Sequence, residues 1–231
     1  MTETTLHRDL KRHYAPSDAF TEVALGAYRI DVVHGEELIE IQCASLSAIR
    51  RKIRVLLEKH PVRVVKPLVR RTQIHRHRTR RGPVVSKRWS PRRGAAWELF
   101  EELIYFTGVF PHPNLVLDVP VIDVAEHRCP RRRRRGVDYR VLDSALLSIC
   151  ETREFKTAWD LIGLLPGALP AGVFNTAQIA AASDCPRWVA QRAAYVLRHA
   201  GALAPVGRDR NGIRYVVADS NPTSLATRRS A

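Results

Sequence analysis

The chain lacks the marks of a membrane-spanning, secreted or zinc-binding protein. Its 231 residues contain no run of about 18 apolar residues, which a membrane-spanning helix would need. The first residues, MTETTLHRDLKRHYAP, lack the apolar centre of a secretion signal. No CxxC pair occurs among the four cysteines, which excludes a zinc ribbon and a thiol redox motif and favours buried thiols. We therefore expect a cytoplasmic protein without a membrane partner.

Acidic residues are also scarce. The chain has 23 Asp and Glu against 38 Lys and Arg, so its formal net charge is +15. A strongly basic balance makes polyanions the expected partners, because Lys and Arg neutralise phosphate groups. DNA is the first candidate partner, which implies a nucleoid-associated location. RNA is the alternative, because charge alone does not separate RNA from DNA.

The basic residues concentrate in residues 70–93, which contain ten Lys or Arg and no acid. A segment with so much charge is not expected in a core, so we predict a loop or an arm that contacts phosphates. Trp89 is expected to anchor this arm in the core, with base stacking as the alternative. The histidines of HRH (75–77) are poor metal ligands here, because the surrounding arginines oppose a cation. The candidate contacts are Arg70, Arg71, Arg80, Arg81, Lys87, Arg88, Arg92 and Arg93.

The first 69 residues follow a regular order of expected elements. Leu6, Leu10 and Tyr14 recur at helical spacing before Pro16, and three short extended runs separated by turns follow them. A second amphipathic segment and a buried apolar run complete the series. The expected order is helix (6–14), three strands (20–25, 28–33, 37–42), helix (45–60) and strand (62–69).

A second run of like charge, RRRRRG at 131–136, suggests a boundary, because it repels itself and has no apolar anchor. A helix (95–108) and a long strand (114–127) are expected before it. We predict a domain at 1–130 that carries the arm, a basic linker at 131–139, a second domain at 140–219 and a loose tail at 220–231.

The second expected domain is mostly helical. Helices are predicted at 141–151 and 158–166, followed by a short helix (176–183), a longer helix (186–201) and a hairpin. This order resembles a winged helix-turn-helix, in which Thr176 caps the first helix of the pair and Pro186 starts the second. Such modules bind DNA, or serve as protein-binding or dimer surfaces. The candidate contacts are Arg187, Gln191 and Arg192 on the longer helix and Arg208 and Arg210 on the wing.

Polar side chains interrupt the second and third expected strands. Asp31 and Glu40 can lie on one side of the sheet near the ends where these strands diverge. Two close carboxylates repel unless a divalent cation neutralises both, and oxygen ligands suit Mg²⁺ or Mn²⁺. Such a cation supports phosphodiester hydrolysis. The alternative is that Asp31 pairs with Arg29 or a lysine, while Glu40 and Gln42 face solvent.

RIDVV followed by LIEIQCASLSAIRRK resembles the PD-(D/E)xK nuclease superfamily, in the E-x-Q form that includes the competence nuclease family. The resemblance implies an α/β protein with a restriction-endonuclease-like α-β-β-β-α-β core over residues 6–69, and often a homodimer. Two departures are Ile30 in place of the motif's proline and Gln42 in place of its lysine. In the implied site, Asp31 and Glu40 bind the metal, and the Ile41 carbonyl can assist them. Gln42 lies near the attacking water, Glu22 is an extra acid, and Arg50 lies near the scissile phosphate.

The sequence thus favours a metal-dependent DNA endonuclease that is positioned by a basic arm and a winged-helix domain. The alternative is a non-catalytic DNA-binding regulator or architectural protein with a degenerate nuclease fold. Binding of a divalent cation by Asp31 and Glu40 would decide between the two.

Overall fold

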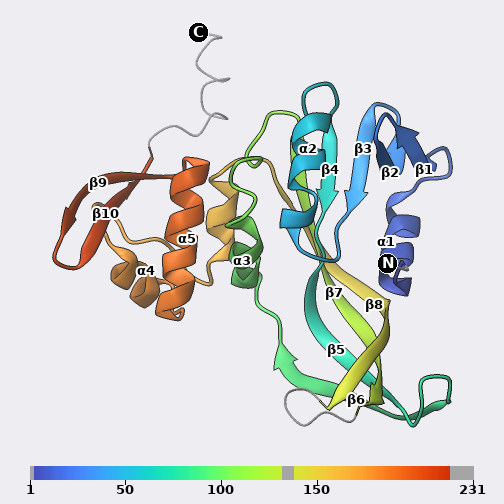
Figure 1. Cartoon of the computed structure of the whole chain (residues 1–231). Helices are drawn as coiled ribbons and strands as arrows, with labels where there is room; N and C mark the ends of the chain where they lie inside the picture. The colour runs from blue at the N-terminus through green and yellow to red at the C-terminus, as the bar shows by residue number, and fades with distance from the viewer. Residues whose placement is uncertain (1–2, 132–137, 219–231) are drawn as a thin grey trace. The chain divides into compact units, whose positions relative to one another are not determined.

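The computed structural model describes residues 3–131 and 138–218 (Figure 1). The described chain forms two compact units that alternate along the sequence. The first comprises residues 1–44, 56–95 and 116–154, and the second comprises residues 45–55, 96–115 and 155–231. The expected boundary at 131–139 therefore falls inside the first unit. The run 132–136 and the tail 220–231 lie outside the described residues.

The first unit is a mixed α/β structure built on an eight-stranded sheet, as the expected α/β class requires. The strands run in the order β1-β2-β3-β4-β7-β5-β6, and β8 pairs with β7. Antiparallel pairs join β1, β2 and β3, whereas β3 pairs with β4 in parallel. The elements are α1 (Thr5–Tyr14), β1 (Phe20–Leu25), β2 (Tyr28–His34), β3 (Glu37–Ile41), β4 (Val62–Val65), β5 (Leu68–His77), β6 (Val84–Arg93), β7 (Leu115–Pro130) and β8 (Tyr139–Phe155).

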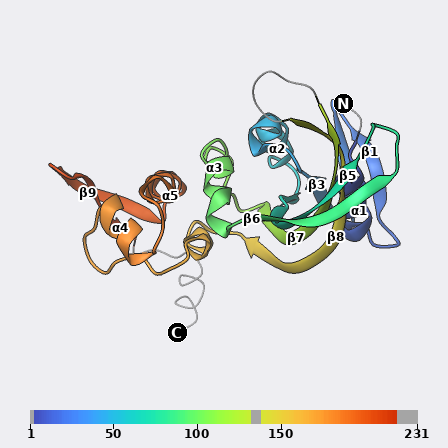
Figure 2. The ribbon, with the colours of Figure 1, turned by 90° about the horizontal axis from the view of Figure 1, so that it is seen from below.

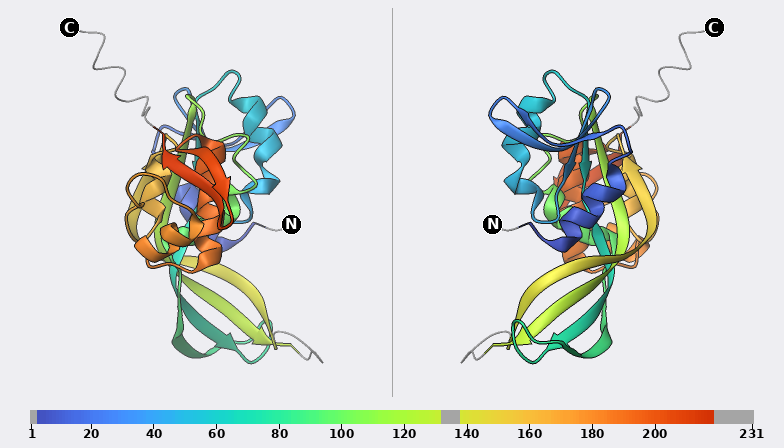
Figure 3. Two further views of the ribbon diagram at one scale, coloured as in Figure 1. Left: turned by 90° about the vertical axis from the view of Figure 1, so that its left-hand side faces the viewer. Right: turned by 90° about the vertical axis from the view of Figure 1, so that its right-hand side faces the viewer.

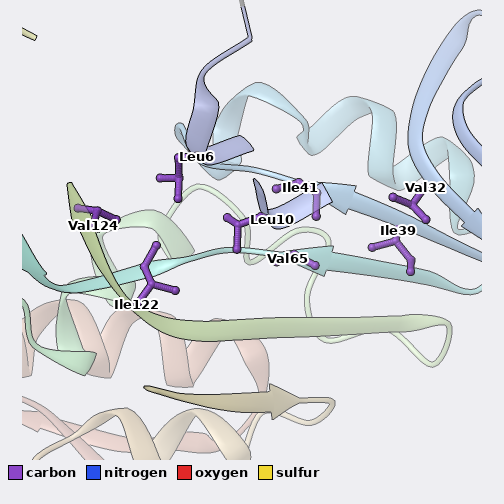
Figure 4. Packing of buried hydrophobic residues seen from close by; sticks show 8 residues of the cluster. All are labelled: Leu6, Leu10, Val32, Ile39, Ile41, Val65, Ile122 and Val124. Atoms are coloured by element: carbon purple, nitrogen blue, oxygen red, sulfur yellow. The ribbon is translucent and has the colours of Figure 1, made fainter. Parts of the chain in front are cut away.

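Helix α1 covers one face of this sheet. Thr4 caps its first turn by accepting a hydrogen bond from the His7 amide, and the helix ends two residues before Pro16. Its apolar face packs on alternate residues of the strands, which gives the cluster in Figure 4. The buried members are Leu6, Leu10, Val32, Ile39, Ile41, Val65, Ile122 and Val124.

The expected arm at 70–93 is instead a β-hairpin made of β5 and β6, so the prediction of a loop was wrong. The two strands pair antiparallel, with Ile74 facing Arg88 and Arg76 facing Ser86. Strand β6 forms an edge of the sheet, where charged side chains stay in solvent while the backbone completes the ladder. Residue 94 closes the hairpin and must be glycine, because a Cβ there would lie 1.9 Å from the Val69 carbonyl oxygen.

Residues 141–151 are also extended, so the helix predicted there was wrong. They belong to β8, which pairs with the long strand β7, and Figure 3 shows these strands twisting together beside β5. Leu146 and Ile149 of β8 pack against the cluster under α1. Apolar residues at helical spacing therefore serve a strand here, because pairing with β7 overrides the local preference.

The second unit contains the remaining helices and a two-stranded sheet. Ser45 caps the short helix η1, and Asn175 and Gln178 form a capping box at α4, one residue earlier than the expected Thr176 cap. Gly201 ends α5 in the left-handed conformation with φ 97°. The elements are η1 (Leu46–Ala48), α2 (Arg50–Leu56), η2 (Ala96–Glu98), α3 (Leu99–Leu103), η3 (Asp160–Leu164), α4 (Thr176–Ala182), α5 (Arg187–Ala200), β9 (Leu203–Asp209) and β10 (Gly212–Val217).

The last 45 described residues of this unit form one arrangement, with α4 and α5 beside the hairpin β9–β10 (Figure 2). Phe174, just before α4, pairs with Tyr215 of β10 and so adds a third extended segment to the hairpin. One face of α5 is apolar, and its Val189, Ala193 and Leu197 are fully buried. Helix α5 is thereby held on its apolar face, while its polar face remains at the surface.

Candidate functional site

Lys11 on α1 is the centre of a cluster of charged groups, here called the Lys11 cluster: Glu3, His7, Lys11, Glu22 and Asp31. The Lys11 ammonium lies 2.6 Å from Glu3 Oε1, contacts Glu22 Oε1, and lies 4.0 Å from Asp31 Oδ1. Its side chain is only 11% exposed. One buried cation is thus shared by three carboxylates.

Asp31 is held by donors on every side. Its Oδ2 atom accepts a hydrogen bond of 2.8 Å from the Ile41 amide and lies 3.3 Å from His7 Nε2. Burial raises the pKa of Asp31, but His7, the Ile41 amide and Lys11 together outweigh it, so the pKa lies below its usual value. Asp31 is therefore ionised, and Lys11 supplies a cation beside it.

Glu22 was expected to be an extra acid at this site, and the structure places it beside Lys11. It lies on β1 between two residues that pair with β2, Thr21 with Val32 and Val23 with Ile30. Its carboxylate also forms an ion pair with Arg29. The sequence alternative had Asp31 paired with Arg29 or a lysine. In the structure Arg29 pairs with Glu22, and the lysine beside Asp31 is Lys11.

Glu40 lies in a different environment from Asp31. It is buried, with 7% of its surface exposed, so the alternative of a solvated face was wrong for this residue. Ile39 and Ile41 on either side of it pack under α1, and side chains of a strand alternate between faces. Strand alternation therefore points Glu40 away from the face that α1 covers.

The divalent ion expected between Asp31 and Glu40 stays a prediction, and the surroundings of the two acids bear on it. The paired ladder of β2 and β3 stops at Val32 and Ile39, just before the two acids would face each other. The Lys11 ammonium lies 4.0 Å from Asp31, so a cation is already present beside this carboxylate. Ile41 donates a hydrogen bond to Asp31 through its amide. Within residues 3–131 and 138–218, no group of three or more His, Cys, Asp and Glu side chains could hold a metal ion.

Gln42 lies beyond the end of β3, where its Oε1 atom accepts a hydrogen bond from the Ala44 amide at 3.2 Å. The sequence analysis missed a second buried cation nearby. Lys66 is 8% exposed and donates to the Ala44 carbonyl at 2.5 Å, while the Gln42 amide donates to Val65 at 2.8 Å. A lysine inside the apolar run VRVVKPLV was the signal for it. His7 and Lys11 were missed for a different reason, because only the packing of α1 brings them to Asp31.

The hairpin β5–β6, here called the basic hairpin, presents many exposed cations. Arg70 and Arg71 are the exceptions, since both bind the buried carboxylate of Asp123. The Arg70 guanidinium and that of Arg71 outweigh burial and hold the pKa of Asp123 far below its usual range. The exposed cations that form no ion pair with the described residues are Arg76, Arg78, Arg80, Arg81, Lys87, Arg88 and Arg93.

Trp89 lies on the outer strand of this hairpin and is 43% exposed, so its expected role as a core anchor was wrong. The Arg71 guanidinium stacks over its ring at 4.5 Å. Arg92 is exposed on the same strand. The hairpin therefore carries an aromatic ring and several cations on a solvated edge strand, which is a suitable surface for a polyanion.

The three predicted DNA contacts on α5 differ in whether they already bind another part of the protein. Arg187 and Gln191 are exposed. Arg192 donates to Glu101 at 2.7 Å and stacks on the ring of Trp188 at 4.6 Å. Its guanidinium is thus engaged within the second unit, whereas Arg187 and Gln191 remain open to a partner.

The hairpin β9–β10 adds further cations. Arg208 and Arg210 are exposed near its tip. Arg214 is engaged, because it binds Asp209 at 2.9 Å and the Val173 carbonyl at 3.2 Å. Arg50 is exposed at the start of α2 in the same unit. These positions agree with surface roles for all three exposed arginines.

Fold and surfaces together define a mixed α/β protein with a buried lysine shared by three carboxylates and a hairpin that carries exposed cations. Residues 4–156 match the family described as Domain of unknown function (DUF8091), and the chain belongs to this family. A protein of Treponema pallidum (strain Nichols), described as an uncharacterized protein, is 31% identical over 171 residues, which cover 73% of this chain and 68% of that protein. No solved structure matches the chain. In the described ranges no helix has the length and apolar character to cross a membrane.

Proposed function

We propose that this protein binds duplex DNA through the basic hairpin, with α5 and the hairpin β9–β10 as a second, winged-helix-like contact. One observation carries the proposal: seven exposed cations of the hairpin form no ion pair with the described residues, whereas the buried Asp123 binds two arginines. The seven cations are Arg76, Arg78, Arg80, Arg81, Lys87, Arg88 and Arg93. Cations on an edge strand are fully hydrated and gain most from neutralising phosphates, which releases counterions. The proposal corresponds to the non-catalytic alternative of the sequence analysis.

Support for the second contact comes from the order of elements around α5. An extended segment at Phe174, two helices and a hairpin occur in the sequence expected for a winged helix. The exposed side chains of Arg187 and Gln191 can donate to base edges in a major groove. Phosphate contacts by the basic hairpin would then supply affinity, and α5 would supply sequence preference.

Metal-dependent cleavage is the second candidate. It is favoured by the placement of Asp31 and Glu40 at the next positions of two paired strands, in the expected order of elements. Against it, the Lys11 ammonium already lies 4.0 Å from Asp31. The two candidates differ in one readout, because only cleavage requires Mg²⁺ or Mn²⁺.

The test measures binding and cleavage of a labelled duplex by the full chain, with and without Mg²⁺ or Mn²⁺. A hairpin variant carries Arg78→Gln, Arg80→Gln and Arg81→Gln, and a matched control carries Arg12→Gln, Arg51→Gln and Lys59→Gln, which removes the same charge from exposed positions. We expect the hairpin variant to bind about a hundredfold more weakly at physiological salt, and the control to bind within a few fold of the wild type.

Equal losses in the two variants would contradict the proposal, since they would show that net charge alone drives binding. Metal-dependent cleavage that disappears in both Asp31→Asn and Glu40→Gln would place the second candidate first. Binding that stays intact while no cleavage occurs in either metal supports the binding function.

A further inference from the structure

A cavity of about 250 Å³ opens between the basic hairpin and the strands β7 and β8. Three arginines, one from each of β5, β6 and β7, line it, and Asp138 and Tyr139 close its other side. All of these residues belong to the first unit. The cavity, here called the arginine pocket, is defined by Arg76, Arg88, Arg128, Asp138 and Tyr139.

The sheet brings these arginines together by its register. Arg76 on β5 is the direct parallel neighbour of Arg128 on β7. Arg88 on β6 faces Ile74, two residues before Arg76. Like charges on neighbouring strands oppose folding, so this arrangement costs free energy unless an anion offsets it.

The protein's own acids offset only part of this charge. Arg128 binds Glu126 through its Nε atom and stacks at 4.0 Å over the ring of Tyr139. Asp138 is the one carboxylate among the described residues that line the pocket. Arg76 and Arg88 are exposed and form no ion pair with the described residues. Two guanidinium groups thus point to a shared cavity without a committed partner.

We infer that the arginine pocket binds the phosphate group of a single nucleotide. Guanidinium groups bind phosphate oxygens in pairs, and two uncommitted arginines provide the donors for them. The stacked pair of Arg128 and Tyr139 adds a flat surface next to the phosphate, on which a base can lie. The cavity is too small for a duplex, so it takes one nucleotide unit, and this function is separate from duplex binding along the hairpin.

The phosphate can come from a free mononucleotide or from the end of a strand. Titration calorimetry on the full chain compares deoxyadenosine 5′-monophosphate, deoxyadenosine, and a trinucleotide with and without a 5′-phosphate. The monophosphate is expected to bind at least about tenfold more tightly than the nucleoside, because charge-assisted hydrogen bonds contribute most of the affinity. Tight binding of only the phosphorylated trinucleotide identifies a strand end, and tight binding of only the mononucleotide identifies a free nucleotide.

Arg76→Gln and Arg88→Gln should each weaken monophosphate binding about tenfold. Arg12→Gln and Lys59→Gln remove the same charge from exposed positions outside the basic hairpin, and should leave the binding unchanged. Because all four side chains are exposed, the variants should fold, which the thermal midpoint verifies.

Equal binding of nucleoside and monophosphate, or equal losses in all four variants, would overturn the inference. Duplex binding is measured in parallel on the same samples. If the monophosphate does not bind while duplex binding is intact and depends on the hairpin, the pocket alone is rejected. If the control variant (Arg12→Gln, Arg51→Gln, Lys59→Gln) also loses duplex binding, the proposed function is rejected instead.

Discussion

The Lys11 cluster and the basic hairpin belong to the same unit but handle charge in opposite ways. In the Lys11 cluster, one buried ammonium is shared by Glu3, Glu22 and Asp31. On the basic hairpin, cations such as Arg78 and Lys87 are exposed and meet no carboxylate among the described residues. Both regions attract attention in the sequence for their charge, yet only one of them is left uncompensated.

The difference separates structural charge from charge that is available to a partner. A buried ion pair contributes to holding α1 on the sheet, because removing either member leaves a charge without compensation. An exposed cation without a partner contributes little to folding and retains its full attraction for an external anion. We therefore expect the acids of the Lys11 cluster to contribute to stability and the exposed hairpin cations to serve the proposed binding.

The largest expected effect on stability comes from Lys11→Met. The substitution keeps most of the side-chain volume but leaves three carboxylates close together, so the free energy of unfolding should fall by about 2 kcal/mol. Chemical denaturation at pH 7 measures it. Lys59→Met, at an exposed position, is the control and should change stability by less than about 0.5 kcal/mol.

The same variant tests whether Lys11 supplies the positive charge that a divalent ion would otherwise supply to the Lys11 cluster. The wild type should keep its thermal midpoint when Mn²⁺ is added, because Lys11 already supplies the positive charge. Lys11→Met should be stabilised by Mn²⁺, since a ligand that binds only the folded state raises the midpoint. A wild type that responds as strongly as the variant would contradict the structural role of the cluster.

Asp123→Asn should have a smaller effect. Asp123 is nearly fully buried and binds both Arg70 and Arg71, but these arginines are a third or more exposed, so solvent screens the pairs. We expect a loss of about 1 to 2 kcal/mol in the free energy of unfolding. Asp18→Asn, whose side chain is 73% exposed, is the matched control and should behave like the wild type.

That loss should also depend on pH in a defined direction. The pKa of Asp123 is lowered in the folded state, so its contribution is present above the unfolded pKa of about 4 and disappears as the pH falls through the lower folded value. The difference between wild type and Asp123→Asn should therefore shrink in acid. A difference that grows as the pH falls below 4 would show that the pair with the arginines is not its source.

The smallest effect is expected from the histidines near the turn of the basic hairpin and from their neighbour His127 on β7. His77 Nε2 lies 2.8 Å from His127 Nδ1, and the rings of His75 and His127 are in edge contact. Burial, with help from neighbouring histidines and Lys87, lowers the pKa of His75 and that of His127 from the usual 6.5. Their contribution to stability is therefore present above pH 6.5 and is lost as the pH falls through the lower folded values.

Unfolding experiments between pH 7.5 and 5.0 measure this loss. His127→Gln should flatten the pH dependence, while His13→Gln, at an exposed position, should leave it as in the wild type. A slope that His127→Gln does not change would remove the histidines from the explanation.

Local patterns predicted the first 65 residues well. The apolar spacing of α1 and the turns between the short extended runs gave the observed order of elements, because each signal lies within a few residues of its element. The hairpin at 70–93 was missed because charge was taken to exclude a strand, although an edge strand needs only backbone pairing. The strand β8 was missed because its pairing with β7 depends on a distant segment.

The candidate site shows the same limit. The positions of Asp31 and Glu40 on paired strands followed from the sequence, but their neighbours did not. Lys11 and His7 reach Asp31 only through the packing of α1, and the face of Glu40 follows from the packing of Ile39 and Ile41. Chemistry that depends on contacts between distant elements thus requires the structure.

The salt dependence of duplex DNA binding tests the central claim most directly. The affinity of the wild type and of the hairpin variant (Arg78→Gln, Arg80→Gln, Arg81→Gln) is measured from low to physiological salt. If each cation neutralises one phosphate, the slope of log affinity against log salt should become shallower by about 3 in the variant. An unchanged slope would contradict the claim that the basic hairpin is the DNA-binding surface.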